Sequence, residues 1–417
     1  MVTNVYISCD TCKTKFRLRW QVEDYKTPVM IRCPKCNTKI RGTLQCGRDG
    51  CSFTNAHIDD EINTADYVQE VSALFITHKL TPSDKFTEVI TPFIRSNYDE
   101  RHQKLLRYLT FIDSYPNEAE KIHDLFNTKS ISYLKTKLKD ENNCYITTCK
   151  QAIKKYRLNS DADILMASHQ YIFVTLMESG ATLPGTDHLM MDLSDLRKFK
   201  SDQMKEFSKL MEVNNYYAHL NNKFPILVEL FNKNYISLIS TLILGGVEKV
   251  DLEEYGLSSV DYEDLLELYR KSYEFIGEFI IYIIGLNNIH ERGDYNSFKN
   301  GISDLEEKIN REDKYNRIQS FVRPDEKYSK GYCDTLNKIV RNAEAHFDVA
   351  YDIFTQKITF TNHGKKETQT HEMYLLELAE ETIRIFGLAI ELWEIAYQLQ
   401  KMRMIIDLGV EWSFGRH

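Results

Sequence analysis

The fifteen residues KIVRNAEAHFDVAYD, from Lys338 to Asp352, bring together three side chains that could do chemistry. Arg341 lies five residues before His346, and Asn342 lies four residues before it. A histidine with a near-neutral pKa can take a proton from a ribose 2′-hydroxyl or return one to a leaving oxygen. An arginine can hold a phosphate and stabilise the charge that builds on it. This set would suit cleavage of RNA by its own 2′-hydroxyl, without a metal ion.

We expect these three residues to lie on one long helix. A turn of 100° per residue brings a set of apolar side chains within ~60° of one direction, over about five turns. The set comprises Leu336, Ile339, Val340, Ala343, Phe347, Ala350, Tyr351 and Phe354. On the same wheel Asn342 and His346 are neighbours, so the amide could select the tautomer of the imidazole. Arg341 lies across the polar face from them.

Two further residues on this outward face point to a partner helix. Ala345 and Val349 lie at its middle, where a small residue and an apolar one are unusual on a fully solvated surface. They would suit another helix that packs closely, and the symmetric solution is the same helix from a second subunit. We therefore expect a homodimer in which two Arg/Asn/His sets flank one cleft.

The motif RNAEAH resembles the R-(polar)-x(3)-H motif of HEPN domains, which are all-helical and often metal-independent ribonucleases. The resemblance implies that Arg341 and His346 are catalytic, that Asn342 is the polar residue after the arginine, and that two protomers pair their motifs. It extends over Leu336–Leu399, because TQKITFTNHGKKETQT (Thr355–Thr370) is typical of a hairpin that turns at NHGK, and Met373–Leu399 is typical of a long closing helix. It further implies a toxin or antiphage (abortive-infection) effector.

Other interpretations of these residues stay open. Arg341 could pair with Glu344 or Asp348, and His346 could be an ordinary histidine on the side of a helix. The protein would then be a noncatalytic adaptor that binds nucleic acid or protein and dimerises through its helices. Nucleotidyl transfer is disfavoured, since no pair of acidic residues stands beside a Gly-Ser loop.

The amino-terminal region contains two C-x2-C pairs, CDTC and CPKC, which are separated by twenty residues. The pairs are Cys9 with Cys12 and Cys33 with Cys36. Four thiolates from two tight turns are the tetrahedral ligand set that Zn²⁺ prefers. The spacing resembles that of zinc ribbons, and we expect a structural Zn²⁺, since four thiolates leave no open position for catalysis.

The same region is basic, whereas the rest of the chain is acidic. Residues 1–41 hold nine Lys or Arg and three acidic residues, so they carry +6 while the remainder sums to −14. Arg17, Arg19 and Trp20 mix cationic and aromatic groups on one expected strand, which is typical of nucleic-acid binders. We expect the ribbon to contact nucleic acid or protein.

Cys46 and Cys51 could replace a ligand, form a second site with His57, or be ordinary thiols.

The bulk sequence favours helices elsewhere. A chain of 417 residues with 17 Gly and 8 Pro predicts several domains and a mainly α fold. We expect a small β zinc ribbon over residues 1–58, a helical middle domain over 59–200, and an all-helical domain with a short hairpin over 201–417. The expected helix starts in the middle domain are Thr64, Ser83, Asp99 and Asp161. The stretch Ser179–Leu189 is typical of a turn or linker.

No segment of the sequence is typical of a signal peptide or a membrane span. The start MVTNVYISCD lacks a basic region followed by an apolar one. The most apolar stretches, Tyr235–Val247 and Tyr273–Leu286, are shorter than a membrane span, and acidic residues interrupt the second. We expect both to be buried helices of a cytoplasmic protein that does not bind membranes.

Overall fold

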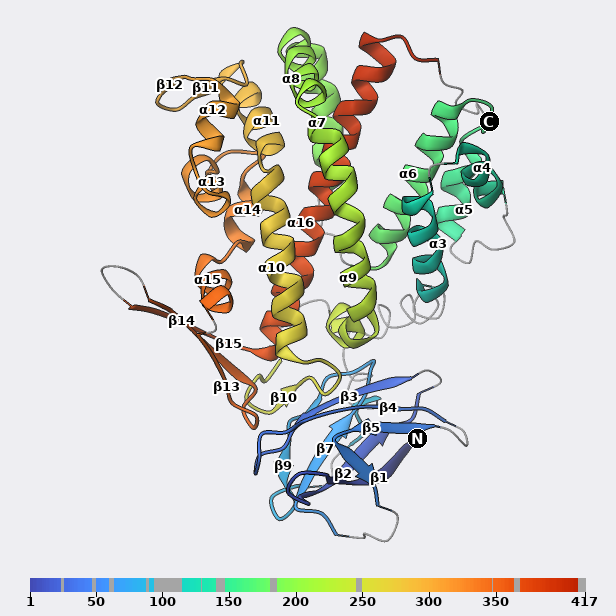
Figure 1. Ribbon diagram of the computed structural model, residues 1–417, viewed down its shortest axis with the longest axis vertical. Helices are drawn as coiled ribbons and strands as arrows, with labels where there is room; N and C mark the ends of the chain where they lie inside the picture. The colour runs from blue at the N-terminus through green and yellow to red at the C-terminus, as the bar shows by residue number, and fades with distance from the viewer. Residues whose placement is uncertain are drawn as a thin grey trace. The chain divides into compact units, whose positions relative to one another are not determined.

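The structure is a computed structural model (Figure 1). It describes residues 1–23, 26–46, 50–59, 64–87, 90–93, 115–128, 130–139, 147–180, 186–244, 250–346, 348–363 and 368–411. The expected helix start at Asp99, and residues 181–185 of the expected linker Ser179–Leu189, lie outside the described residues.

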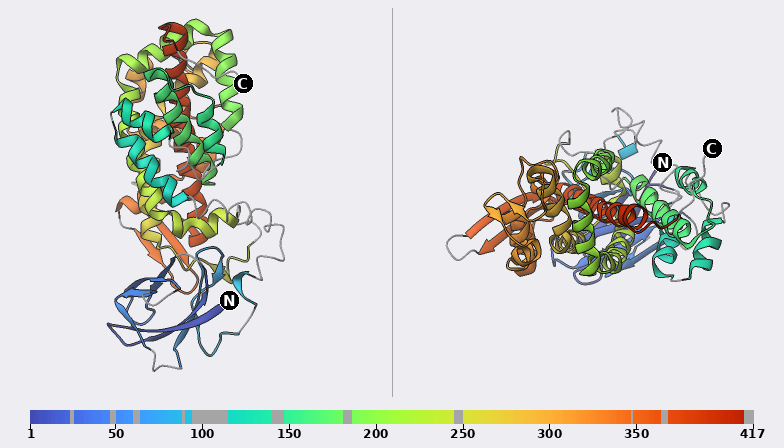
Figure 2. Two further views of the ribbon diagram at one scale, coloured as in Figure 1. Left: turned by 90° about the vertical axis from the view of Figure 1, so that its right-hand side faces the viewer. Right: turned by 90° about the horizontal axis from the view of Figure 1, so that it is seen from above.

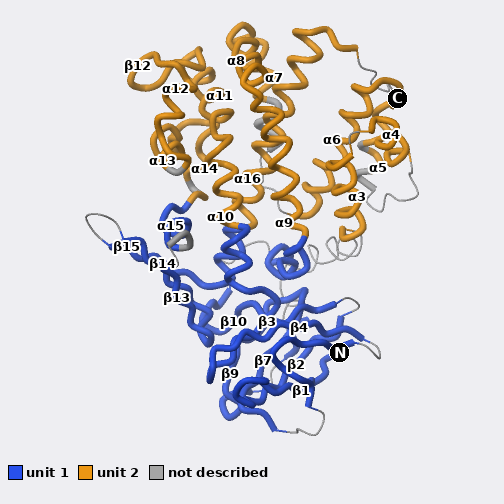
Figure 3. The backbone as a smooth tube through the Cα atoms, in the orientation of Figure 1, with its two compact units in different colours: residues 1–110, 233–268, 337–382 blue, residues 111–232, 269–336, 383–417 orange. Residues whose placement is uncertain are grey.

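The chain forms two compact units, each of which is assembled from three stretches of sequence (Figure 3). Unit 1 contains Met1–Thr110, Lys233–Leu268 and Asn337–Thr382, and unit 2 contains Phe111–Asn232, Tyr269–Leu336 and Ile383–His417. Each unit is a set of segments that contact one another, and neither unit is one continuous stretch of the sequence. The three consecutive domains with boundaries at residues 58 and 200 stay a prediction.

The amino-terminal part of unit 1 is built from two sheets. The first has the strand order β6-β1-β2-β7-β9, in which β2 and β7 run parallel and the other pairs run antiparallel. Its strands are β1 (Val2–Cys9), β2 (Lys15–Gln21), β6 (Ala56–Ile58), β7 (Tyr67–Val71) and β9 (Thr81–Pro82). The second is the antiparallel sheet β3-β4-β5, with strands β3 (Thr27–Arg32), β4 (Lys39–Leu44) and β5 (Cys51–Thr54).

Alternating apolar residues of both sheets form one core. In β3 the residues Val29 and Ile31 face this core, and in β2 Phe16 and Leu18 do so, as the period of two in a strand requires. Between β4 and β5, Gly42 pairs with Phe53, whose ring occupies the space that a side chain at position 42 would need. The head of the protein is therefore a β structure with its own apolar core.

The mainly α fold class predicted from the sequence is wrong. Helices account for 54% of the structure and strands for 20%, and the sheet-rich head extends well beyond residue 58. The expected helix near Thr64 is replaced by β7, whose residues Tyr67–Val71 pair with β2. Ser83 lies in a turn. The β-branched and aromatic residues of YVQEV fit a buried strand, and this tertiary pairing outweighed the helical pattern.

The remaining strands of unit 1 form two small sheets. β8 (Thr77–His78) pairs with β10 (Tyr255–Gly256). β13 (Val349–Tyr351), β14 (Lys357–His363) and β15 (Thr368–Tyr374) form an antiparallel sheet in that order. The expected hairpin in Thr355–Thr370 is confirmed by the pairing of β14 with β15, although its turn lies partly outside the described residues. The expected closing helix is confirmed as α16 (Leu375–Met402).

Unit 2 is a bundle of helices (Figure 2). Helices that lie wholly within it are α3 (Tyr115–Asn127), α4 (Ile131–Lys139), α5 (Thr147–Lys154), α6 (Asp161–Glu178), α7 (Thr186–Phe199), α8 (Ser201–Val213), α11 (Ile281–Arg292), α12 (Leu305–Asn310), α13 (Lys314–Phe321) and α14 (Lys330–Thr335). Three of the five boundaries between the units fall within α9 (Tyr216–Leu244), α10 (Tyr262–Phe279) and α16. Unit 2 also contains a short hairpin, β11 (Ser297–Phe298) with β12 (Gly301–Ile302), and a π-helical turn, Arg403–Asp407.

Local signals and aromatic packing explain the bundle. The helix expected to start at Asp161 does so, but its cap is Ser160, which forms a reciprocal capping box with Asp163. In the core, Phe231 stacks on Phe386 with ring centroids 4.2 Å apart. Such stacked pairs contribute about 1 kcal/mol beyond the burial of their area.

One helix among the described residues, α9, is long and apolar enough to cross a membrane by length and composition alone. Of its most apolar window, 61% is buried inside the structure, as in the core helix of a soluble protein. The two apolar stretches of the sequence analysis lie on α9, α10 and α11, and largely buried side chains such as Leu238 and Ile276 confirm that these are core helices.

Candidate functional site

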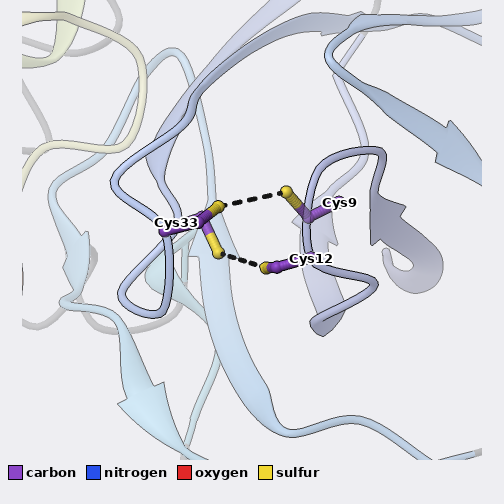
Figure 4. Close-up of side chains that lie close together, drawn as sticks. Cys9, Cys12 and Cys33 are labelled. Atoms are coloured by element: carbon purple, nitrogen blue, oxygen red, sulfur yellow. Dashed lines mark hydrogen bonds between the residues drawn. The ribbon is translucent and has the colours of Figure 1, made fainter.

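The four cysteines of the two C-x2-C pairs lie together and could hold a metal ion (Figure 4). Their sulfur atoms all lie within 4.8 Å of one another. The sulfur of Cys9 lies 3.7 Å from that of Cys36, and the sulfur of Cys12 lies 3.4 Å from that of Cys33. Ligand bonds of about 2.3 Å in a tetrahedral zinc site place sulfurs about 3.8 Å apart, so this set fits zinc.

The two pairs sit on matching turns, one between β1 and β2 and the other between β3 and β4. In the first, the N–H of Cys9 donates to the carbonyl of Thr14 at 2.9 Å, and the N–H of Lys13 donates to the carbonyl of Cys9 at 2.9 Å. The second turn repeats both bonds with Cys33, Asn37 and Thr38 at 2.9 and 2.7 Å. Each turn thereby aims two thiols at the same point.

The residue after each second cysteine adopts a left-handed backbone. Lys13 has φ 61° and Asn37 has φ 58°. Asparagine visits this region more readily than most residues, whereas lysine does so at some cost in free energy. The turn geometry therefore imposes the conformation of Lys13, which fits a loop shaped around a bound ion.

A threonine two residues after each pair also contacts the sulfurs. The hydroxyl oxygen of Thr14 lies 3.0 Å from the sulfur of Cys12, and that of Thr38 lies 3.1 Å from the sulfur of Cys36. The Thr14 hydrogen bond lowers the pKa of Cys12 to about 6, whereas burial raises the pKa of Cys33 to about 12. The repeated C-x2-C-x-T pattern, CDTCKT and CPKCNT, is a sequence signal that the C-x2-C interpretation missed.

Cys46 and Cys51 are not part of this cluster. Among the described residues the metal-binding group consists of the four cysteines alone. Cys46 is exposed, and Cys51 is half-buried at the edge of the core. The Nδ1 atom of His57 lies 2.7 Å from Oδ1 of Asp10, and among the described residues His57 forms no metal-binding group with these two thiols.

The three residues expected to contact nucleic acid, Arg17, Arg19 and Trp20, already have partners within unit 1. Arg19 is buried against Glu70, with 2.5 Å between Nη1 and Oε1. Trp20, expected on the same nucleic-acid-binding strand, is also buried, and its indole N–H donates to the hydroxyl of Thr27 at 3.1 Å. Arg17 lies over the ring of Phe86, 5.4 Å from its centroid. The three side chains expected to contact nucleic acid are therefore engaged by the protein's own residues.

The predicted catalytic residues lie on a short helix, α15 (Lys338–His346). The side chain of Asn337 caps its first turn by accepting a hydrogen bond from the N–H of Ile339 at 2.9 Å. Val340 and Ala343 are fully buried and anchor the helix, which contacts β14 and β15.

Arg341 and Asn342 are both half-buried and contact each other. Nη1 of Arg341 donates to Oδ1 of Asn342 at 3.0 Å. His346 is the last residue of α15, and its side chain lies outside the described residues, as does that of Glu344. The structure therefore brings Arg341 and Asn342 together, while the position of the imidazole stays a prediction.

The five-turn helix predicted for Leu336–Phe354 is wrong. The helix ends at His346, where the N–H of Asp348 donates to the carbonyl of Ala343 at 2.9 Å, and β13 starts at Val349. Pairing with Phe360 and Ile358 of β14 holds the β-branched and aromatic residues of β13 extended. Val349 consequently does not share a helical face with Ala345, and this argument for a second subunit is lost.

No protein-family model matches the chain, and no curated protein or solved structure matches it. The comparisons therefore neither support nor oppose the resemblance to ribonucleases.

Proposed function

We propose that this protein is a metal-independent endoribonuclease whose site is built around Arg341, Asn342 and His346 of α15. The observation that supports the proposal is the hydrogen bond of 3.0 Å from Nη1 of Arg341 to Oδ1 of Asn342. It orients the guanidinium on a helix whose other side is fixed by two fully buried residues, Val340 and Ala343. An oriented guanidinium beside an imidazole is what cleavage of a ribose phosphate needs.

The proposed reaction is an attack of the 2′-hydroxyl on the neighbouring phosphorus. The bond from phosphorus to the 5′-oxygen breaks, and the products are a 2′,3′-cyclic phosphate and a 5′-hydroxyl. His346 takes the proton from the 2′-hydroxyl as general base. Arg341 stabilises the additional negative charge on the phosphate oxygens in the transition state.

The proton balance of this reaction supports a twofold pair of sites. One proton leaves the 2′-oxygen while another must reach the departing 5′-oxygen on the opposite side of the phosphorus. One imidazole cannot lie at both positions in a single in-line step. A homodimer would supply His346 from each subunit, one as base and one as acid.

Zn²⁺ is proposed as the resident ion of the four-cysteine site. Cys9, Cys12, Cys33 and Cys36 would hold it, and four thiolates leave no position for a substrate, so its role is to stabilise the head. A nuclease of this kind would act in the cytoplasm as a toxin or antiphage effector, where cutting host or phage RNA limits growth or infection.

The rival proposal is a noncatalytic adaptor that uses the zinc-binding head to bind protein or nucleic acid. What favours it is the closed metal site in a β head with its own core. Both proposals place the metal in the same structural role, so they differ only at α15.

The test is cleavage of end-labelled RNA by the full-length protein in EDTA, with zinc content measured alongside. The proposal predicts cleavage by the wild type, a loss of at least about 100-fold in Arg341→Ala and His346→Ala, and 2′,3′-cyclic phosphate ends. Lys330→Ala, which removes an exposed cation of α14, is the control and should cleave normally. Cleavage that survives both α15 substitutions would contradict the proposal, and intact RNA with a folded dimer would favour the adaptor.

A further inference from the structure

A network of side chains connects the metal-binding turn of β3 and β4 to the strand that follows α15. Arg32 directly precedes Cys33, and it pairs across the ladder with Lys39 of β4. These two residues are therefore the last pair of the β3–β4 ladder before the second metal-binding turn. Both side chains point to the start of α10, and all the residues concerned belong to unit 1.

Acidic residues at the start of α10 receive these two cations. Nη2 of Arg32 lies 2.5 Å from Oε1 of Glu263 and 3.5 Å from Oδ1 of Asp261. Nζ of Lys39 lies 2.9 Å from Oε2 of Glu263 and also contacts Asp261. The side chain of Asp261 is only 3% exposed, so the ion pairs with Asp261 are shielded from water, whereas Glu263 is 50% exposed and its pairs lie at the surface.

Two tyrosines continue the network. The guanidinium of Arg32 lies 5.0 Å from the ring centroid of Tyr262, within the range of a cation–π contact. The ring of Tyr262 stacks on that of Tyr351, with centroids 4.9 Å apart and an angle of 28° between the planes. A small pocket of about 20 Å³ lies among these side chains, which is room for a water molecule but not for a substrate.

Tyr351 stands close in sequence to the proposed catalytic helix. It is the last residue of β13 and pairs with Ile358 of β14. Backbone hydrogen bonds of 2.9 Å join Asp348 to the carbonyl of Ala343 in α15 and to the N–H of Thr361 in β14. A displacement of β13 would therefore pull on the end of α15, where His346 lies.

We infer that Arg32, Tyr262 and Tyr351 are positioning residues that make the order of β13 and of the end of α15 depend on metal in the four-cysteine site. The ion holds the turn that carries Arg32, Arg32 holds Tyr262, and Tyr262 holds Tyr351. Loss of the ion loosens the base of the turn and thereby the strand next to His346. An effect of this coupling on catalysis rests on the proposed ribonuclease function. The coupling between the metal site and β13 is independent of that function.

Hydrogen exchange of the full-length protein measures the coupling directly. Removal of zinc should speed amide exchange in residues 343–361 by at least about tenfold. Arg32→Ala should give the same increase while the protein keeps one zinc per chain, because no cysteine is changed. Arg41→Ala is the matched control, since Arg41 contacts Asp264 at 3.2 Å and lies 3.9 Å from Asp261 but does not stack on Tyr262, and it should leave exchange in this segment unchanged.

Conservative variants separate positioning from general destabilisation. Tyr351→Phe keeps the stacked ring and should retain protection, whereas Tyr351→Thr keeps a strand-forming residue but loses the ring and should exchange faster. Arg32→Lys keeps the charge but loses the planar stacking group, and it should fall between Arg32→Ala and the wild type.

Two results would overturn the inference. One is faster exchange confined to the head, residues 1–82, after zinc removal, and the other is normal protection of residues 343–361 in Arg32→Ala. The failure of the proposed function looks different. If the wild type cuts no RNA but zinc removal still speeds exchange at 343–361, the coupling stands and the ribonuclease does not.

Discussion

Arg341 donates a hydrogen bond from Nη1 to Oδ1 of Asn342, its neighbour in the sequence, at 3.0 Å. Adjacent residues on a helix point about 100° apart, so this contact bends the long arginine side chain toward the flank that carries the asparagine. The helical wheel predicts His346 on the same flank as Asn342. The side chain of His346 lies outside the described residues, so a guanidinium close to the imidazole stays a prediction.

The first prediction concerns this contact. Asn342→Ala removes the acceptor, so the guanidinium should lose its fixed orientation. We expect RNA cleavage to fall by roughly 10- to 100-fold, in line with the cost of a misplaced catalytic group. Initial rates at saturating RNA would show the loss in kcat. An Asn342→Ala protein that cleaves at the wild-type rate would show that the contact has no role in orienting Arg341.

A second prediction concerns the metal. Cys33→Ser removes one of four ligands, and we expect the zinc content after dialysis to fall from one ion per chain to nearly none. Because apparent binding energies of structural zinc are on the order of 10 kcal/mol, the head should also melt at a lower temperature. Metal analysis and thermal unfolding measure both effects. Cys46→Ser, at an exposed cysteine outside the cluster, should keep its zinc.

A third prediction follows from a buried carboxyl group of unit 2. Burial raises the pKa of Glu391 from 4.5 to about 7. Between these two values the unfolded chain loses the proton while the folded chain keeps it, so stability falls as pH rises. Glu391→Gln should remove this loss, and its advantage over the wild type should grow from nearly zero at pH 4.5 to about 3 kcal/mol above pH 7.

The measurement for Glu391 is the unfolding midpoint of both proteins across that pH range. Glu206→Gln, which changes an exposed glutamate of α8, is the control and should follow the wild type at every pH. If Glu391→Gln is no more stable than the wild type at pH 8, burial does not raise the pKa of Glu391.

The fourth prediction concerns Lys79, which is almost completely buried in unit 1. Its ammonium donates to the carbonyl oxygens of Leu252 and Thr355 and lies 4.6 Å from the ring centroid of Tyr374. Burial lowers the pKa of Lys79 to about 8. Lys79→Met would leave the carbonyls of two half-buried residues without this donor, and we expect a loss on the order of 2 kcal/mol in the free energy of unfolding.

Denaturant titration of Lys79→Met beside Lys85→Met, an exposed lysine of the same segment, would measure the difference. Equal midpoints for the two variants would mean that the contacts of Lys79 with Leu252 and Thr355 do not stabilise the fold.

The parts of the structure that the sequence predicted are those set by local patterns. The two C-x2-C turns bring four sulfurs together because each turn is fixed by a few consecutive residues. The helix beginning at Asp161 and the hairpin of β14 and β15 are likewise encoded by caps and alternation over short spans.

The parts that sequence reasoning missed depend on distant partners. β7 is a strand because it pairs with β2, and the segment after His346 is a strand because it pairs with β14. The helical wheel treats Val349 and Tyr351 as helix positions, since it contains no information about a neighbouring strand. The partners of the basic head were missed for the same reason, because Arg32 and Glu263 are 231 residues apart in the sequence.

The most direct test of the proposed ribonuclease is an RNA in which the single ribose 5′ to a mapped cleavage site lacks its 2′-hydroxyl. The wild type in EDTA should cut the all-ribose strand and leave the substituted position intact, because the nucleophile has been removed, and His346→Ala should cut neither strand. Cleavage of the substituted position at an unchanged rate would show that another nucleophile acts, and it would contradict the mechanism assigned to Arg341 and His346.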